Sequence, residues 1–113
     1  MRLLVAAALA ISMAAQDAKP LVAVSFYSAS YDGRRTTSGE RFSSNKLTAA
    51  HLTLPLGTHV RLTNPANGKS VEVVVNDRGP HVAGREISVT RRAAQELGII
   101  RQGVGHLQME VLP

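Results

Sequence analysis

The chain has 113 residues, which is enough for one small domain with a single core. It contains no cysteine, which excludes a disulfide framework, a thiolate nucleophile, a cysteine-based zinc site and a lipoprotein anchor. The net charge of +5 favours anionic polymers as partners, but two Phe, two Tyr and no Trp provide few rings for base stacking, so we expect no nucleic-acid binding.

The N-terminal segment differs in composition from the rest of the chain. Arg2 supplies a positive charge, and residues 3–15 are almost entirely apolar. The apolar run is too short to span a bilayer comfortably and ends in small residues, so residues 1–15 are predicted to be a secretory signal peptide, with a buried N-terminal helix as the alternative. Residues 16–20 are then a short leader. Residues 21–113 are the expected domain, which this pattern predicts to be secreted without a stable membrane anchor.

The first part of this domain combines a predicted strand with a long loop. Residues 21–27 are rich in Val and aromatic side chains and predict a strand. Residues 28–44 are dense in Gly, Ser, Thr and Arg and predict a surface loop, which at this length in a small domain is usually functional. Residues 47–51 are expected to form a short helical turn.

The second part is predicted to be mainly β-structure. Residues 59–63 and 70–76 alternate between apolar and polar side chains, and the turn at 64–69 contains Asn-Gly, so these segments predict a β-hairpin. Residues 90–97 predict a helix with Thr at its start and Gly after its end. Residues 105–112 alternate again and predict the last strand.

Titratable side chains occur at the ends of these elements. Asp77 comes at the end of an apolar strand and just before the Gly79-Pro80 turn, while Glu40 and His51 lie in earlier segments that can fold back toward it. Acid–base chemistry on a polymer needs such side chains on turns at the rim of a rigid scaffold. These residues are therefore the candidate functional site.

Four segments carry a resemblance to a known family. Residues 33–42 (GRRTTSGERF), 47–58 (LTAAHLTLPLGT), 60–64 (VRLTN) and 75–80 (VNDRGP) resemble the rare lipoprotein A family in order and spacing. The resemblance extends over about residues 24–112. It implies an all-β fold with short helices, a six-stranded double-psi β-barrel of the kind found in expansins. It also implies a bacterial septal ring lytic transglycosylase.

The implied activity is endolytic cleavage of peptidoglycan between N-acetylmuramic acid and N-acetylglucosamine, in cell-wall remodelling and division. A general acid protonates the glycosidic oxygen, and the deprotonated 6-hydroxyl of the muramyl residue attacks its own anomeric carbon, which leaves a 1,6-anhydro end. Because this nucleophile is intramolecular, one carboxyl group with polar positioning groups can suffice. We expect no cofactor, peptidoglycan glycan strands as the partner, and a monomer.

The resemblance suggests three catalytic residues, each with an alternative. Asp77 matches the family's acid in Asn-Asp-Arg-Gly-Pro and is the leading acid/base, although an Asp here also suits turn bonding or pairing with Arg78. Glu40 matches the family's acidic loop residue and is either a second acid/base, a ligand for sugar hydroxyls, or a solvated side chain. His51 either positions Asp77 or the sugar, or is a structural histidine bonded to loop backbone.

Tyr27, Tyr31 and Arg78 are the predicted substrate-binding residues. The two tyrosine rings can stack on the C–H faces of sugars, although Tyr27 equally suits strand packing. The remaining histidines show no ligand spacing, so no metal site is expected; they are His59, His81 and His106.

The chain departs from the family at Ser88. Many relatives have Asp-Leu-Ser before the helix, with the Asp at the position of the acid in expansin-like barrels, whereas this chain has Ile-Ser-Val. Ser43-Ser44 also stand where relatives often have an acidic residue. Because serine cannot act as an acid at neutral pH, a second hypothesis is a non-catalytic, expansin-like module that binds or loosens wall glycan.

Overall fold

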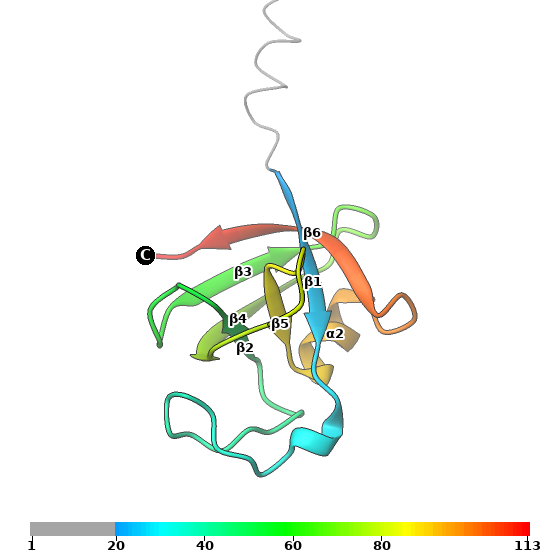
Figure 1. Ribbon diagram of the computed structural model, residues 1–113. Coiled ribbons are helices and arrows are strands. Elements are labelled where there is room, and N and C mark those ends of the chain that lie inside the picture. The colour runs from blue at the N-terminus through cyan, green and yellow to red at the C-terminus, as the bar shows by residue number, and fades with distance from the viewer. Residues whose placement is uncertain (1–19) are drawn as a thin grey trace, which may run out of the picture.

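The protein is a closed barrel of six strands in the spatial order β1-β5-β2-β4-β3-β6 (Figure 1). The computed structural model describes residues 20–113, so the predicted signal peptide and all of the leader but its last residue lie outside the described residues. The elements in chain order are β1 (Leu21–Phe26), η1 (Ala29–Tyr31), β2 (Thr48–His51), β3 (His59–Thr63), β4 (Ser70–Asp77), β5 (Ile87–Val89), α2 (Arg91–Leu97) and β6 (Val104–Val111).

Two of the neighbouring strand pairs are parallel and four are antiparallel. The parallel pairs are β1 with β5 and β2 with β4. The register of β2 against β4 shifts after Ala49, so that Ala50 lies opposite Asp77. The expected six-stranded double-psi β-barrel is confirmed. Because a closed barrel has no free strand edge, its loops and strand ends are the surfaces available for binding.

Aliphatic side chains fill the barrel, as the alternating pattern predicts. In the β3–β4 hairpin, Val60 lies opposite Val73 and Leu62 opposite Val71, with all four side chains buried. Such alternation places one face of each strand in the core and the other in solvent. The largest fully buried side chains, which include members of five strands and α2, are Val24, Val60, Leu62, Val73, Val75, Ile87, Val89, Thr90, Leu97, Ile99 and Leu107.

The predicted helix is confirmed as α2. The Thr90 hydroxyl accepts a hydrogen bond from the Ala93 N–H at its start, and Gly98 ends it in a left-handed conformation with φ of 74°. Its buried face consists of Ala93, Ala94 and Leu97. No helix among residues 20–113 is long and apolar enough to cross a membrane.

The helical turn predicted for residues 47–51 is wrong. Thr48–His51 is strand β2, which pairs with β5 on one side and β4 on the other, and all four residues are buried. Alanine favours helices locally, but strand pairing on both sides overrides that preference. Strand β5 was not predicted at all, because a strand of three residues is too short to show a periodic pattern.

The segment between β1 and β2, named the β1–β2 loop, forms an extension at one end of the barrel (Figure 1). Its two arms are joined by backbone hydrogen bonds: the Gly33 N–H donates to the Phe42 carbonyl at 2.9 Å and the Phe42 N–H donates to the Arg34 carbonyl at 2.7 Å. The Ser38 N–H donates to the Asn76 carbonyl at 3.0 Å. The loop is thus attached to the end of β4, directly before Asp77.

Candidate active site

Two adjoining hollows lie where the β1–β2 loop meets the barrel. One has a volume of about 440 Å³ and the other about 210 Å³. Tyr27, Tyr31 and Asp77 line both of them, so these residues form a shared wall. Arg78 and Ser88 line only the larger one. Four of the six predicted site residues are therefore brought together at this junction.

Asp77 has an asymmetric set of hydrogen bonds. Its Oδ1 accepts from the Thr37 N–H at 3.0 Å, from the Thr37 hydroxyl at 2.8 Å and from the Arg78 N–H at 2.9 Å. Its Oδ2 accepts only from the Tyr27 hydroxyl, at the long distance of 3.5 Å. Three donors on one oxygen fix the orientation of the carboxyl group. Oδ2 is the oxygen left for a proton or a substrate hydroxyl.

Thr37 was missed by the sequence reasoning. It lies in the loop segment that carries the family resemblance, but an exposed threonine between Thr36 and Ser38 has no feature that distinguishes it from a solvated loop residue. Only the folding of the loop back onto β4 brings it to Asp77. It is a second residue, besides Tyr27, that bonds this carboxyl group from a distant part of the sequence.

The chain turns at Gly79, two residues after Asp77 at the end of β4. Gly79 is buried and has a φ of +141°, in a region that residues with a side chain rarely adopt. A Cβ there would lie 3.7 Å from the Tyr27 hydroxyl and 3.8 Å from the Ala50 Cβ, which are ordinary contact distances. The backbone conformation, and not a lack of space, is thus what favours glycine at this turn.

An aromatic cluster supports the shared wall. The ring of Tyr27 lies 5.6 Å from that of Tyr31 and 5.0 Å from that of the buried Phe42, between centroids. Burial, and next the negative charge of Asp77, raise the pKa of the Tyr27 hydroxyl well above its usual range. Tyr27 therefore stays protonated and is available as a donor. The Arg34 guanidinium lies over the exposed Tyr31 ring, with Arg34 Cζ 5.0 Å from the centroid of that ring.

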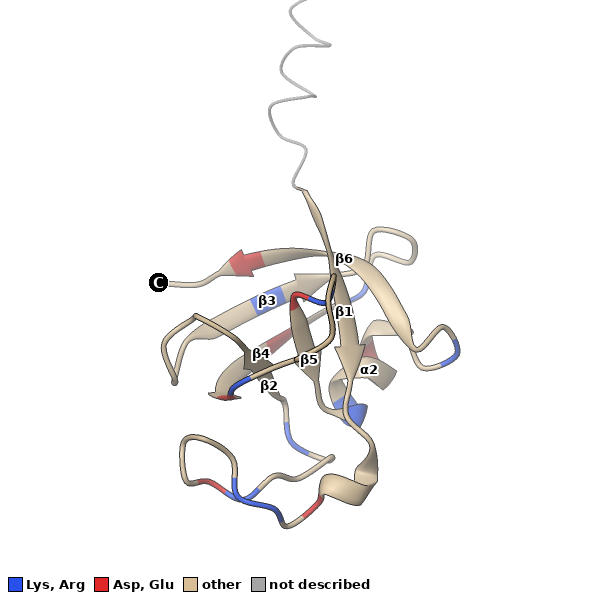
Figure 2. Cartoon of the chain, in the orientation of Figure 1, with Lys and Arg blue, Asp and Glu red and all other residues tan. Residues whose placement is uncertain are grey.

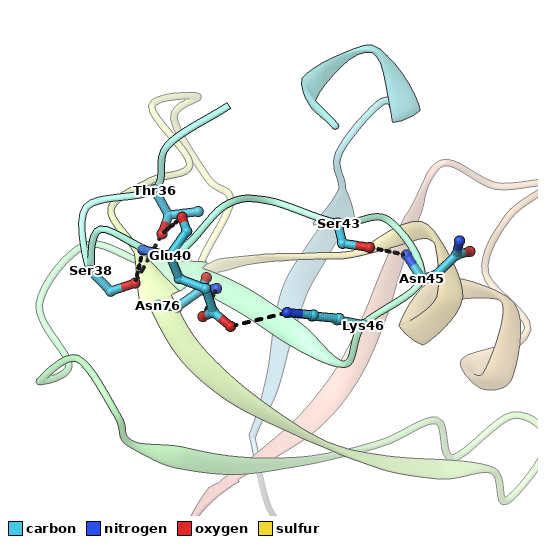
Figure 3. A network of polar contacts seen from close by, with 7 residues as sticks. All are labelled: Thr36, Ser38, Glu40, Ser43, Asn45, Lys46 and Asn76. Atoms are coloured by element: carbon cyan, nitrogen blue, oxygen red, sulfur yellow. Dashed lines mark hydrogen bonds and ion pairs between the residues drawn. The ribbon is translucent and has the colours of Figure 1, made fainter. Parts of the chain in front are cut away.

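Glu40 lines neither of these hollows and belongs to a network of polar contacts in the β1–β2 loop (Figure 3). Its Oε1 accepts from the Asn76 side-chain amide at 2.9 Å, and its Oε2 pairs with the Lys46 ammonium at 3.5 Å. The hydrogen bond from the Asn76 amide is the main cause that holds the pKa of the Glu40 carboxyl below its usual range; burial opposes it, and Lys46 adds to the lowering. Glu40 is therefore ionised, and its contacts attach the β1–β2 loop to the residue before Asp77.

His51 and Arg78 both contact the segment that follows β2. The buried His51 ring accepts at Nδ1 from the N–H groups of Thr53 and Leu54, each at 3.1 Å, and its Nε2 donates to the Glu86 carboxylate at 3.2 Å. Since Nδ1 accepts, the ring proton is assigned to Nε2. The Arg78 guanidinium donates to the backbone carbonyls of His51 at 3.1 Å and Leu54 at 2.6 Å. These contacts are those of side chains that stabilise a loop.

Ser88 occupies a buried position in the site. It is 2% exposed and lines the larger hollow together with Asp77. A carboxyl group at this position would share the hollow with Asp77, whereas the serine hydroxyl cannot supply a proton at neutral pH. The departure from the family therefore falls within the candidate site.

Another hollow lies away from Asp77 and has different chemistry. A hollow of about 470 Å³ between the segments 54–59 and 111–113 contains none of the predicted site residues and no carboxylate side chain. Within residues 20–113, no group of three or more His, Cys, Asp or Glu side chains is placed to hold a metal ion. The two hollows at Asp77 are the candidate active site.

Comparison with known proteins identifies the family. The family described as lytic transglycolase matches residues 23–109. The chain belongs to this family. Over 88 residues it is 50% identical to the probable endolytic peptidoglycan transglycosylase RlpA of Synechocystis. The matched region is 78% of this chain and 27% of the relative. Over 86 residues it is 51% identical to the endolytic peptidoglycan transglycosylase RlpA of Neisseria meningitidis. Here the matched region is 76% of this chain and 36% of the relative.

The resemblance stated from the motifs is thereby confirmed. The chain spans about a third of the length of these curated relatives. Among solved structures, the barrel is similar to a papain inhibitor from Streptomyces, with a TM-score of 0.66 and 18% identity over 86% of this chain and 96% of that one. It is also similar to cerato-platanin 3 from M. perniciosa, with a TM-score of 0.61 and 19% identity over 82% of this chain and 94% of that one. These two likenesses concern the fold alone.

Proposed function

We propose that this barrel is an endolytic peptidoglycan lytic transglycosylase with Asp77 as its acid/base. The observation that carries the proposal is the Asp77 carboxyl group, which lines both hollows, with three donors on Oδ1 and only the distant Tyr27 hydroxyl on Oδ2. The family membership and the names of the relatives support the same reaction class. The substrate is the glycan strand of peptidoglycan, cut between N-acetylmuramic acid and N-acetylglucosamine.

The reaction needs one proton to be given and one to be taken. Asp77, protonated at Oδ2, donates to the glycosidic oxygen as the bond from that oxygen to the muramyl anomeric carbon breaks. The carboxylate so formed accepts the proton of the muramyl 6-hydroxyl, whose oxygen bonds to the anomeric carbon. The products are a free 4-hydroxyl on N-acetylglucosamine and a 1,6-anhydro-muramyl end. Asp77 regains its proton and no water is consumed.

The two adjoining hollows suit a cut inside a long strand. Sugar units on both sides of the broken bond need a place, and Asp77 lies on the wall that the hollows share. Tyr31 is exposed there and offers ring surface to a sugar, while Tyr27 donates toward Oδ2. These residues are assigned to substrate binding and to support of the acid/base.

The other predicted site residues receive positioning roles. Glu40 is ionised and bonded to Asn76, so it holds the β1–β2 loop against β4 in place of acting as a second acid. His51 and Arg78 stabilise the segment after β2 through its backbone. None of the three needs to exchange a proton with the glycan in this mechanism.

Ser88 favours a second candidate function. Its buried position in the larger hollow leaves Asp77 as the only carboxylate among the residues that line the two hollows. A barrel that needs two carboxyl groups would then bind glycan without cutting it. The second candidate is therefore a non-catalytic, expansin-like module that binds or loosens the wall.

The test is mass spectrometry of glycan strands incubated with the protein in heavy-oxygen water. The transglycosylase predicts new 1,6-anhydro-muramyl ends without heavy oxygen. New reducing ends that contain heavy oxygen would indicate a hydrolase and refute the proposal. No new ends, together with co-sedimentation of the protein with the same strands, would favour the binding module.

Secretion to the periplasm, cleavage of residues 1–15 and a monomeric state are part of the same proposal. The basic charge of the chain suits an anionic cell wall. The mass of the protein recovered from the periplasmic fraction would give the cleavage site, and light scattering would give the oligomeric state. Recovery of the uncleaved chain in the cytoplasm would refute the secretion proposal.

A further inference from the structure

The β1–β2 loop contains three arginines, Arg34, Arg35 and Arg41, and Figure 2 marks basic residues along it in blue. Their guanidinium groups have different surroundings. Arg35 donates to the Gly39 carbonyl at 2.7 Å, and Arg41 donates to the Gly33 carbonyl at 2.8 Å. These two side chains brace the loop. The Arg34 guanidinium has neither a carbonyl nor a carboxylate partner within residues 20–113, and its contact there is the Tyr31 ring.

Arg34 lines the smaller hollow together with Tyr31 and Asp77. A cation held over an exposed ring gains only about 0.5–1 kcal/mol, which orients the guanidinium without satisfying it. Its planar fork of N–H donors matches a carboxylate in a bidentate pair. The side chain is thus an oriented cation with unused donors, on the wall that continues to the proposed acid/base.

The proposed substrate has a carboxylate at a matching place. In an alternating strand of N-acetylglucosamine and N-acetylmuramic acid, only the muramyl unit bears a lactyl ether at C3, and the bond to be cut leaves C1 of that same ring. A group that recognises the lactyl carboxylate next to Asp77 therefore fixes the unit whose C1 bond lies over Oδ2. The N-acetylglucosamine units are neutral and have no carboxylate for a guanidinium to bind.

We propose that Arg34 forms a carboxylate subsite that binds the lactyl group of the muramyl unit and sets the register of the strand over Asp77. This inference rests on the proposed function, because it assumes that the strand occupies the two hollows. The ligand chemistry is a carboxylate. The cell wall has two sources of such a carboxylate. One is the free lactyl group of strands without stem peptides, and the other is the set of carboxylates of stem peptides in strands whose lactyl groups bear a peptide.

The test measures binding, so that it does not depend on cleavage. Asp77→Asn serves as a common background in which strands stay intact, and Arg34→Gln is compared with Arg101→Gln. Arg101 is an exposed arginine that lines neither hollow, so its substitution removes the same charge elsewhere. Each protein is titrated calorimetrically with peptide-free strands, with the same strands after conversion of the lactyl carboxylates to methyl amides, and with peptide-bearing strands.

We expect Arg34→Gln to raise the Kd for peptide-free strands about tenfold, as for loss of one charge-assisted pair at a partly exposed site. Conversion of the lactyl carboxylates to methyl amides should raise the Kd of the Asp77→Asn parent by the same factor. For Arg34→Gln in this background, amidated and unmodified peptide-free strands should have the same Kd. Arg101→Gln should stay within about twofold. Thermal unfolding of each variant checks that the fold is kept.

Three results would overturn the subsite. One is an equal effect of Arg34→Gln and Arg101→Gln, and another is an Arg34→Gln loss that persists on amidated strands. A loss confined to peptide-bearing strands would refute the lactyl assignment and give the stem-peptide carboxylate as the ligand. Because cleavage is assayed separately, an intact Arg34 effect without anhydro ends would refute the transglycosylase alone.

Discussion

Asp77 and Glu40 are two carboxyl groups at the junction of the β1–β2 loop with β4, yet their surroundings differ. Asp77 is half-buried, lines two hollows, and collects three donors on one oxygen. Glu40 has a side chain that is 44% exposed and divides its oxygens between Asn76 and Lys46. Asp77 lines the hollows and has one oxygen with a single long hydrogen bond, whereas both oxygens of Glu40 are used to hold the loop.

The difference shows how a loop can supply a site without supplying its acid. Glu40 attaches the loop to Asn76, and Thr37 of the same loop then reaches Asp77. The carboxyl group proposed as the acid/base, that of Asp77, comes from the rigid barrel, where its backbone is fixed in strand β4. The loop contributes donors and an aromatic wall, which fits the general division between scaffold and binding loops.

Removal of the Thr37 hydroxyl is the strongest test of this division between loop and barrel. Thr37→Val deletes the 2.8 Å bond to Asp77 Oδ1 and keeps the backbone donor, so the rate of anhydro-end formation should fall about tenfold, or about 1.4 kcal/mol. Thr37→Ser is the matched control and should retain most of the rate. Equal rates for Thr37→Val and Thr37→Ser would show that the hydroxyl does not support the acid/base.

A smaller effect is expected from Tyr27→Phe. The hydroxyl lies 3.5 Å from Asp77 Oδ2, at the limit of a hydrogen bond, so its loss should lower the rate only about threefold. The ring packing against Phe42 is kept, and the melting temperature should hardly change. A rate loss as large as that of Asp77→Asn would instead make the tyrosine an acid in its own right.

Glu40→Gln should have a still smaller effect on the rate. A glutamine oxygen can accept from the Asn76 amide as Glu40 does, so the loop attachment survives and the rate should stay within about twofold of wild type. Steady-state kinetics on peptide-free strands gives the value. A hundredfold loss would restore Glu40 as a second acid/base and remove the contrast with Asp77.

The smallest effect concerns stability and pH. Because the folded-state pKa of Glu40 is lowered from 4.5, its charge stabilises the fold above that value, and the contribution is lost as pH falls through the folded-state pKa. Because the Glu40 side chain is 44% exposed and solvent screens its charge, the difference in unfolding free energy between wild type and Glu40→Gln should not exceed about 1 kcal/mol at neutral pH. Urea unfolding at neutral and at acidic pH measures it. A difference that does not shrink on acidification would show that the charge of Glu40 is not its source.

The sequence predicted the parts of the fold that have long regular patterns. The β3–β4 hairpin, the last strand and α2 with its caps at Thr90 and Gly98 are confirmed, because alternation and capping are local signals. Strands β2 and β5 were not predicted as strands, because they are short and lie between neighbours that come from distant parts of the chain. Closure of the barrel decides their conformation.

The candidate site was predictable in part for the same reason. Asp77 was found because a strand, an acid and a Gly-Pro turn follow one another in the sequence. Thr37 and Arg34 were not selected, because the contacts that distinguish them, with Asp77 of β4 and with the Tyr31 ring, form only when the loop has folded. His51 carried two interpretations, and its ring bonds to the backbone of the following loop are of the structural kind.

The role of Asp77 as the acid/base is tested most sharply by the rate at which Asp77→Asn forms 1,6-anhydro-muramyl ends. The substitution keeps the shape of the side chain and the acceptor for Thr37 but removes the titrating proton, so the folded variant should lose at least about a hundredfold in rate. Its melting temperature and its binding to intact strands should remain close to those of wild type. Anhydro ends formed at the wild-type rate by a folded Asp77→Asn protein would contradict the assignment of Asp77.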